Sequence, residues 1–332
     1  MAEEKEIKLD KYDRAILWQL DINARMSYSD IARKIRLSKQ AVRYRIVRLE
    51  KEGIIRGYRM LGNLSSMGYI YCRLHVKLFN VDQVAEKSII SSIMKNEKVN
   101  WVVSCDGPYD ILVGLIGKTE MEIEKNISDI FVAHKNYIFN YDFATVTRLV
   151  LFNRGYWLGK EVATVKKYMV GTEKPYIKPQ PVPLAPEDKR ILMALAGDAR
   201  VPIVKIAREV GLAPETVSYK IKKFERSGII AKYFLLLNYR KVGTQLYKAL
   251  FYANPMEPEV EKGFAEFVAS NPYTIDYVKT LAPWQIEVDL EARNNEHYHE
   301  IISDIRNKFK GIIKDYETLY ILKEHKFLYF PI

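Results

Sequence analysis

The stretch that decides the fold is residues 38–58, SKQAVRYRIVRLEKEGIIRGY, together with its counterpart at residues 213–233, APETVSYKIKKFERSGIIAKY. The second stretch lies 175 positions after the first, and the same shift aligns the residues before it. Between residues 9–58 and 184–233, 19 of 50 positions are identical without a gap. A gapless match of this length indicates a tandem repeat whose two units fold alike.

Each unit should begin with a head of three short helices. In the first unit, Ser38 is a good N-cap for the third helix, and Gly53 should end that helix. Its buried stripe recurs at positions i, i+4 and i+7, as Val42, Ile46 and Leu49. A short strand is expected next, around Ile54, Ile55 and Tyr58.

The rest of each unit alternates strands and helices in the order βαββαβ. The first copy predicts strands near 69–79, 99–105, 109–116 and 140–151, and the second near 245–253, 274–281, 284–291 and 314–323. This order is typical of a ferredoxin-like sheet with helices on one face, so the fold class is α+β. The open sheet faces need cover, which the two copies can give each other, and exposed sheet edges offer a route to further assembly.

The repeat also gives the expected domain boundaries. Residues 1–58 and 184–233 should be two helix-turn-helix DNA-binding domains, and residues 59–157 and 234–332 two ferredoxin-like effector and dimerisation domains. Residues 158–183 remain as a linker, which carries Pro175, Pro179, Pro181 and Pro183. Because proline sustains neither a helix nor a central strand, an extended spacer is expected there.

The charge of the chain is concentrated in the heads. Residues 9–58 hold 12 Lys/Arg and 6 Asp/Glu, and residues 184–233 hold 10 and 6, so the heads carry +10 of the net +11. This basic surplus makes nucleic acid the leading partner. The sequence contains no apolar run long enough for a membrane span, and its first ten residues lack a signal-peptide core. With only two cysteines, a cytoplasmic protein is expected.

The third helix of each head offers a basic face opposite its buried stripe. Gln and Arg near its N-terminal turn are the residue types that read base edges in the major groove, whereas Arg48 and Lys51 suit phosphates. A solvated helix face is the alternative, but the same excess on the same helix in both units favours DNA. The predicted contacts are Ser38, Lys39, Gln40, Arg43, Tyr44, Arg48 and Lys51, and then Thr216, Ser218, Tyr219, Lys222 and Lys223.

The two reading faces differ. Glu215 stands where the first copy has Gln40, and Ala213 replaces the capping Ser38. An acid at this position repels phosphate unless it accepts a hydrogen bond from a cytosine amino group. The two heads should therefore read different sequences, and whether the second head binds DNA stays open.

The motifs of the first head resemble those of the Lrp/AsnC (feast/famine) family of transcription regulators. They include Asn23-Ala24-Arg25, Ile31-Ala32, Leu37-Ser38, Arg48-Leu49-Glu50, Gly53-Ile54-Ile55 and Gly57-Tyr58. The resemblance covers both units, although the second has Asp198 for Asn23 and Ala213 for Ser38. It implies a helix-turn-helix head followed by a βαββαβ effector domain. Members normally have one unit per chain, so this chain resembles a fused pseudo-dimer.

The resemblance also implies a site for an amino-acid-like effector. The family has a Gly-x-Tyr-Asp pattern near the turn before its third strand, which here reads Gly107-Pro108-Tyr109-Asp110. The second copy has Ala282-Pro283-Trp284-Gln285 instead, so an effector is expected at Gly107, Tyr109 and Asp110. The alternative is that Gly107 and Pro108 only form a hairpin turn.

An enzyme is not expected, and neither is a cofactor or a metal. The chain has no Gly-rich phosphate loop, Cys-x-x-Cys or His-Glu-x-x-His motif. Two alternatives remain open: an oligomerising module without DNA specificity, and an enzyme like the sirohaem decarboxylases, which resemble this family in fold. Their haem-like substrate is held by His and Arg, for which Arg73, His75 and His134 are the candidates.

The sequence therefore predicts a transcription regulator that binds specific double-stranded DNA. Two unlike heads on paired bodies predict an imperfect palindrome with half-sites about 34 Å apart, or a multiple of this. The two units should pair within one chain, and homo-oligomers remain open.

Overall fold

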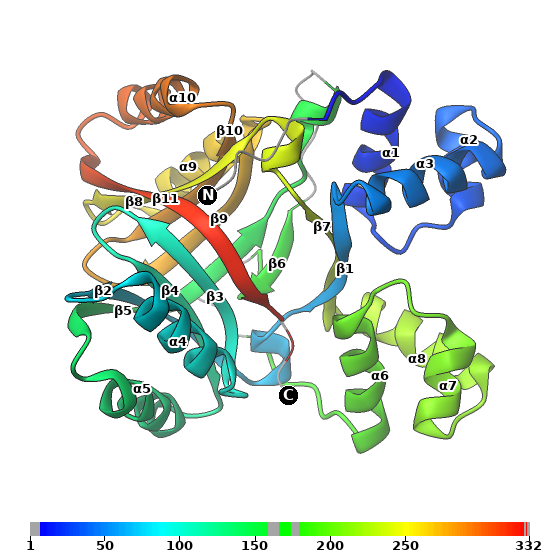
Figure 1. Ribbon diagram of the computed structural model, residues 1–332, viewed down its shortest axis with the longest axis horizontal. Coiled ribbons are helices and arrows are strands. Elements are labelled where there is room, and N and C mark those ends of the chain that lie inside the picture. The colour runs from blue at the N-terminus through cyan, green and yellow to red at the C-terminus, as the bar shows by residue number, and fades with distance from the viewer. Residues whose placement is uncertain (1–6, 159–165, 174–178, 329, 331–332) are drawn as a thin grey trace.

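The computed structural model describes residues 7–158, 166–173, 179–328 and 330. Two three-helix heads lie side by side at one end of a single β-barrel, and a two-stranded ribbon joins heads and barrel (Figure 1). The first head consists of α1 (Lys11–Ile22), α2 (Tyr28–Ile35) and α3 (Lys39–Lys51). The second consists of α6 (Pro186–Gly197), α7 (Ile203–Val210) and α8 (Pro214–Arg226).

Helix caps explain where the head helices begin. Asp10 caps α1 in a capping box with Asp13, and the Ser38 hydroxyl accepts a hydrogen bond from the Ala41 N–H at the start of α3. Helix α8 begins without a side-chain cap after Ala213 and has Pro214 in its first turn. The buried side chains of α3 are Val42, Ile46 and Leu49, as the sequence predicts.

The strand that follows each head pairs with its counterpart in the other unit. Strands β1 (Ile55–Gly62) and β7 (Ile230–Leu237) form an antiparallel ribbon in which Tyr58 lies opposite Leu235. Helix α6 packs against β1 and α1 packs against β7, so each head contacts the strand of the other unit. The ribbon thus joins the two heads to each other as well as to the barrel.

The βαββαβ order and the α+β class are confirmed in both units. The first body is β2 (Ile70–Leu78), α4 (Gln83–Met94), β3 (Val99–Asp106), β4 (Ile111–Gly117), α5 (Glu120–His134) and β5 (Ile138–Leu151). The second is β8 (Gln245–Ala253), α9 (Pro258–Ser270), β9 (Thr274–Leu281), β10 (Ile286–Ala292), α10 (Asn295–Lys308) and β11 (Ile313–Phe327). The strand orders β5-β2-β4-β3 and β11-β8-β10-β9 match each other.

The two sheets join at both edges and close into a ring. Strand β3 pairs with β11, and β9 pairs with β5, both antiparallel. The helices lie on the outside, where Leu74 and Val113 pack against α4 and α5, while the alternate residues of each strand face the interior. All four edge strands of the two bodies, β3, β5, β9 and β11, are paired within the ring. The expectation of assembly through exposed sheet edges is therefore wrong for these strands.

The linker contains a strand that the sequence analysis missed. Strand β6 (Lys167–Val170) lies within residues 158–183 and pairs with the end of β5, which makes this part of the linker more than an extended spacer. Further along, the Val182 N–H donates to the Ser66 carbonyl, so the linker returns along the first unit. Pro175 lies outside the described residues.

No described helix is both long and apolar enough to cross a membrane.

Candidate nucleic-acid interface

Helix α3 presents most of its predicted contact residues to solvent. The exposed set is Ser38, Lys39, Gln40, Arg43, Tyr44 and Lys51. The Tyr44 side chain is 71% exposed, although it is large and partly apolar. Among the residues that the structure describes, none forms an ion pair with Lys39, Arg43 or Lys51. These cations are therefore available to a polyanion.

Arg48 differs from the other predicted contacts because it is bound within the head. Its Nη2 atom lies 2.7 Å from Oδ2 of Asp13, whose side chain is 2% exposed, and its Nε atom lies 3.8 Å from Glu52. Arg45 binds the other oxygen of Asp13 at 2.8 Å. We therefore assign Arg48 first to holding α1 against α3, and its role as a phosphate contact stays a prediction.

Helix α8 carries a similar face with a different charge pattern. Thr216, Tyr219, Lys222 and Lys223 are exposed, whereas Ser218 is only half-exposed. Lys220 binds Asp188 at 2.6 Å, as Arg45 binds Asp13 in the first head. Lys223, the counterpart of Arg48, has no ion pair with any described residue, while Glu215 is exposed at the first turn.

The two heads are joined by a reciprocal pair of arginines that sequence reasoning did not single out as functional. Arg25 donates to the Ala199 and Val201 carbonyls of the second head. Arg200 donates to the Ala24 and Met26 carbonyls of the first head at 2.8 and 3.0 Å. We call this arrangement of Arg25 and Arg200 the arginine clamp. Its signal in the sequence was the identity of these positions in both units.

The arginine clamp also connects to α3 and α8. The guanidinium of Arg200 lies over the Tyr58 ring at 5.1 Å, and that of Arg25 lies over the Tyr233 ring at 5.9 Å. Each tyrosine hydroxyl donates to a glutamate near the end of one of these helices, Tyr58 to Glu50 of α3 at 2.6 Å and Tyr233 to Glu225 of α8 at 2.7 Å. These contacts fix the orientation of α3 relative to α8.

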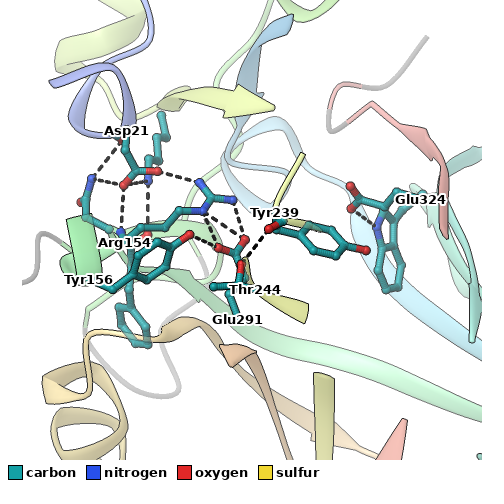
Figure 2. Close-up of polar contacts among 11 residues, drawn as sticks. Asp21, Arg154, Tyr156, Tyr239, Thr244, Glu291 and Glu324 are labelled. Atoms are coloured by element: carbon teal, nitrogen blue, oxygen red, sulfur yellow. Dashed lines mark hydrogen bonds and ion pairs between the residues drawn. The ribbon is translucent and has the colours of Figure 1, made fainter. Parts of the chain in front are cut away.

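A second, asymmetric connection holds the first head to the barrel (Figure 2). Arg154, just after β5, binds Asp21 of α1 at 2.6 Å and Glu291 of β10 at 2.9 Å, and all three side chains are buried. Burial raises the pKa of Asp21, but Lys232 and Arg154 outweigh burial and lower it. The Tyr156 hydroxyl also donates to Glu291. Position 196, the counterpart of Asp21, is alanine, so the second head lacks this network.

The predicted effector residues already have partners in the protein. Lys77 lies 3.0 Å from one carboxylate oxygen of Asp110, and the Leu78 N–H donates to the other at 2.7 Å. The Tyr109 hydroxyl donates to Asp142 at 2.6 Å. Gly107 has φ +134°, and a Cβ there would lie 2.6 Å from the Thr318 carbonyl oxygen. These contacts support the hairpin-turn alternative, and an effector at this turn stays a prediction.

The barrel interior contains a buried ionic cluster drawn from both units. Arg73 binds Glu287, and Lys248 binds Glu287 and Asp289. Burial lowers the pKa of His75, beside Glu287, to about 3, so this imidazole is neutral. Burial and the nearby Asp289 carboxylate raise the pKa of Asp276 to about 8.

The three candidate haem contacts are not brought together. Arg73 and His75 are 1% and 0% exposed inside the ring, whereas His134 ends α5 on its outside. The cavity that Arg73 lines measures about 60 Å³, while pockets for small organic ligands are usually about 300–1,000 Å³. Among the described residues, no group of three or more His, Cys, Asp and Glu is arranged to hold a metal ion.

Comparison with known proteins finds similarity both in sequence and in structure. The winged helix-turn-helix DNA-binding family matches residues 9–56 and 188–231. The uncharacterised HTH-type transcriptional regulator PH1055 of Pyrococcus horikoshii is 32% identical over 137 residues, which are 40% of this chain and 82% of that protein. The HTH-type transcriptional regulator FL11 of the same organism is 26% identical over 149 residues, 44% of this chain and 93% of FL11. Each relative thus corresponds to about one unit.

Among the solved structures that match is the crystal structure of the sirohaem decarboxylase NirDL. It has a TM-score of 0.62 and 14% identity, and it covers 97% of this chain and 94% of that one. At this identity the likeness concerns the fold, and it extends over both units.

Proposed function

This chain belongs to the HTH-type transcriptional regulators, with the Lrp/AsnC plan in both of its units, and from that membership we propose that it acts as a fused pseudo-dimer on one asymmetric DNA site. In this proposal, residues 1–58 and 184–233 are the DNA-binding domains, and residues 59–157 and 234–332 are the effector and dimerisation domains. One chain then supplies both of the heads that a regulator with one unit per chain obtains from two chains.

The observation that carries the proposal is the arginine clamp between two exposed basic helices. The clamp contacts, the β1–β7 ribbon and the barrel ring all restrict movement of α3 relative to α8. A rigid pair of reading helices matches half-sites separated by a set number of base pairs, about one turn of the duplex or a multiple.

The two helices should read unlike half-sites. Gln40, Arg43 and Tyr44 lie on the exposed face of α3, where Glu215, Ser218 and Tyr219 lie on α8. Gln and Arg suit adenine and guanine, whereas Glu accepts from a cytosine amino group. The proposed site is therefore an imperfect palindrome.

Selection of bound sequences from random double-stranded DNA at physiological salt tests the proposal. We expect two unequal half-sites at one preferred spacing. Arg43→Ala should cost about 1–3 kcal/mol of DNA-binding free energy and relax the preference at one base pair. Lys51→Ala should weaken binding to all sequences alike and reduce the slope of log affinity against log salt concentration by about one. Enrichment of no sequence, or identical behaviour of the two variants, would contradict sequence-specific reading.

An amino-acid-like effector at Gly107, Tyr109 and Asp110 is a finer part of this proposal. Such a ligand would have to replace Lys77 at the Asp110 carboxylate or Asp142 at the Tyr109 hydroxyl. A thermal-shift screen with the free amino acids tests it, with Asp110→Asn as the variant that should abolish any shift. The sirohaem decarboxylase alternative has its own readout, a tetrapyrrole absorbance near 400 nm in the purified protein.

A further inference from the structure

A groove of about 450 Å³ lies where the first unit, the second unit and the linker meet. Its walls are the start of β2, the middle of β5, the end of β6 and the end of β9. This volume falls within the usual range of about 300–1,000 Å³ for small-molecule sites. Sites of this kind combine apolar walls with a few polar groups that converge on the ligand.

Strand β5 changes neighbours at this groove. Thr145 and Val146 pair with β2 on one side, whereas Leu149 and Val150 pair with β6 on that side. Opposite β9 the register shifts between Val146 and Arg148, which leaves Thr147 without a partner in the ladder. A bulge of this type redirects the side chains beside it and is frequent next to binding sites. The groove is therefore formed by strand geometry.

Two cations face each other across the strands at the floor of the groove. Arg148 of β5 and Lys279 of β9 are direct partners in the antiparallel ladder, an arrangement that is destabilising for like charges. Both bind Glu261 of α9, at 3.2 and 3.1 Å, and this carboxylate is only 6% exposed. Among the described residues, Glu261 is the one carboxylate with an ion pair to either cation, which leaves one positive charge unbalanced. The remaining donors of Arg148 and Lys279 are available to a further acceptor.

The other seam of the ring shows that the fold does not require this charge pair. The residues that correspond to Arg148 and Lys279 after the 175-residue shift are Lys323 and Ser104, which are also direct partners. Ser104 is neutral and lies 3.0 Å from Nε2 of His325. At this matched position the seam between β3 and β11 therefore has one cation, whereas the seam between β9 and β5 has two.

We propose that this groove binds a small organic acid that has one carboxylate and an apolar chain of about four to six carbons. The carboxylate binds Arg148 and Lys279 and balances the charge that Glu261 leaves unmatched. The apolar chain lies along Val146, Val170 and Leu281, which line the same groove. The Leu281 side chain is 67% exposed, and its cover by a ligand removes apolar surface from water.

Titration calorimetry on the full chain without DNA tests the proposal. The probes are 3-methylbutanoate and hexanoate, each compared with its amide. We expect the acids to bind and the uncharged amides to bind at least about tenfold more weakly. Arg148→Gln should lower the affinity for the acids at least about tenfold. Lys323→Gln removes the matched cation of the other seam and should leave the affinity unchanged.

Three results would overturn the assignment: no heat from either acid up to about 10 mM, equal binding of acid and amide, or equal loss in the Arg148 and Lys323 variants. A melting curve on each variant checks that it is folded, and Lys279→Gln replaces Arg148→Gln if the latter unfolds. Because DNA is absent, the outcome does not depend on whether the heads bind it.

Discussion

A substitution of Arg48 distinguishes a role in the stability of the head from a role in DNA binding. Its guanidinium holds the buried Asp13 carboxylate, which after Arg48→Ala would keep Arg45 and the Asp10 N–H as partners. Partial loss of partners for a buried charge should lower the free energy of unfolding by about 1–3 kcal/mol. Urea denaturation measures this change, and Lys51→Ala, on the same helix but exposed, should stay within about 0.5 kcal/mol of the parent. An unchanged stability with a reduced salt slope for DNA would instead make Arg48 a phosphate contact.

Asp276 gives the barrel interior a pH dependence. Its pKa is raised by burial and by Asp289 to about 8, against 3.8 for the ordinary group, so the folded state holds this proton where the unfolded state has lost it. The stability that this proton provides is complete below about pH 4 and is lost as the pH rises through about 8. Lys248 and Arg73, which also face Asp276, oppose the shift without reversing it.

Asp276→Asn removes this titration. The variant should gain at least about 1 kcal/mol relative to the parent between pH 5.5 and pH 8, because each pKa unit corresponds to about 1.4 kcal/mol. Urea midpoints of both proteins at the two pH values measure the difference. His75 titrates in parent and variant alike, so it cancels in the comparison. A difference independent of pH would show that Asp276 is already ionised in the folded protein.

At the scale of elements, the arginine clamp should set the spacing that the protein accepts. The parent should prefer one half-site separation, because Arg25 and Arg200 hold the two heads through each other's carbonyls. The double variant Arg25→Ala, Arg200→Ala should lose most of this preference and keep its affinity for a single half-site. Binding to DNA with half-sites separated by a series of distances measures both. A variant with the parent's spacing preference would leave the ribbon and the barrel as the elements that set the distance.

The sequence predicted elements well and the contacts between distant elements poorly. Strands 245–253 and 274–281 have the predicted bounds, because periodicity is a local signal. Closure of the ring depends on β3 meeting β11, more than 200 positions apart, and no local pattern encodes that pairing. The ion pairs of Arg48 within the head were missed for a different reason. A helical wheel gives the direction of the Cβ atom, whereas a long side chain reaches around the helix to Asp13.

At the scale of the whole molecule, the shared ring should make both bodies unfold together. Leu115 of β4 and Leu290 of β10 are equivalent positions, and both are 0% exposed. Leu→Ala at either position should cost about 2–5 kcal/mol. Because β3–β11 and β5–β9 cross between the bodies, each variant should shift the same single calorimetric transition. Two separate transitions, each sensitive to only one substitution, would show that the bodies unfold independently.

The network around Arg154 determines which halves can pair. Two identical first units placed in this arrangement would put Ile116 where Glu291 stands and Gly57 where Lys232 stands. Arg154 would then lose one of its two carboxylates in a buried setting, an arrangement that costs several kcal/mol. Pairing of one first unit with another first unit is therefore unfavourable. The second unit, which supplies the missing carboxylate, is part of the same chain. In the proposed function one chain carries both heads at any dilution, so occupancy of the DNA site should follow chain concentration to the first power.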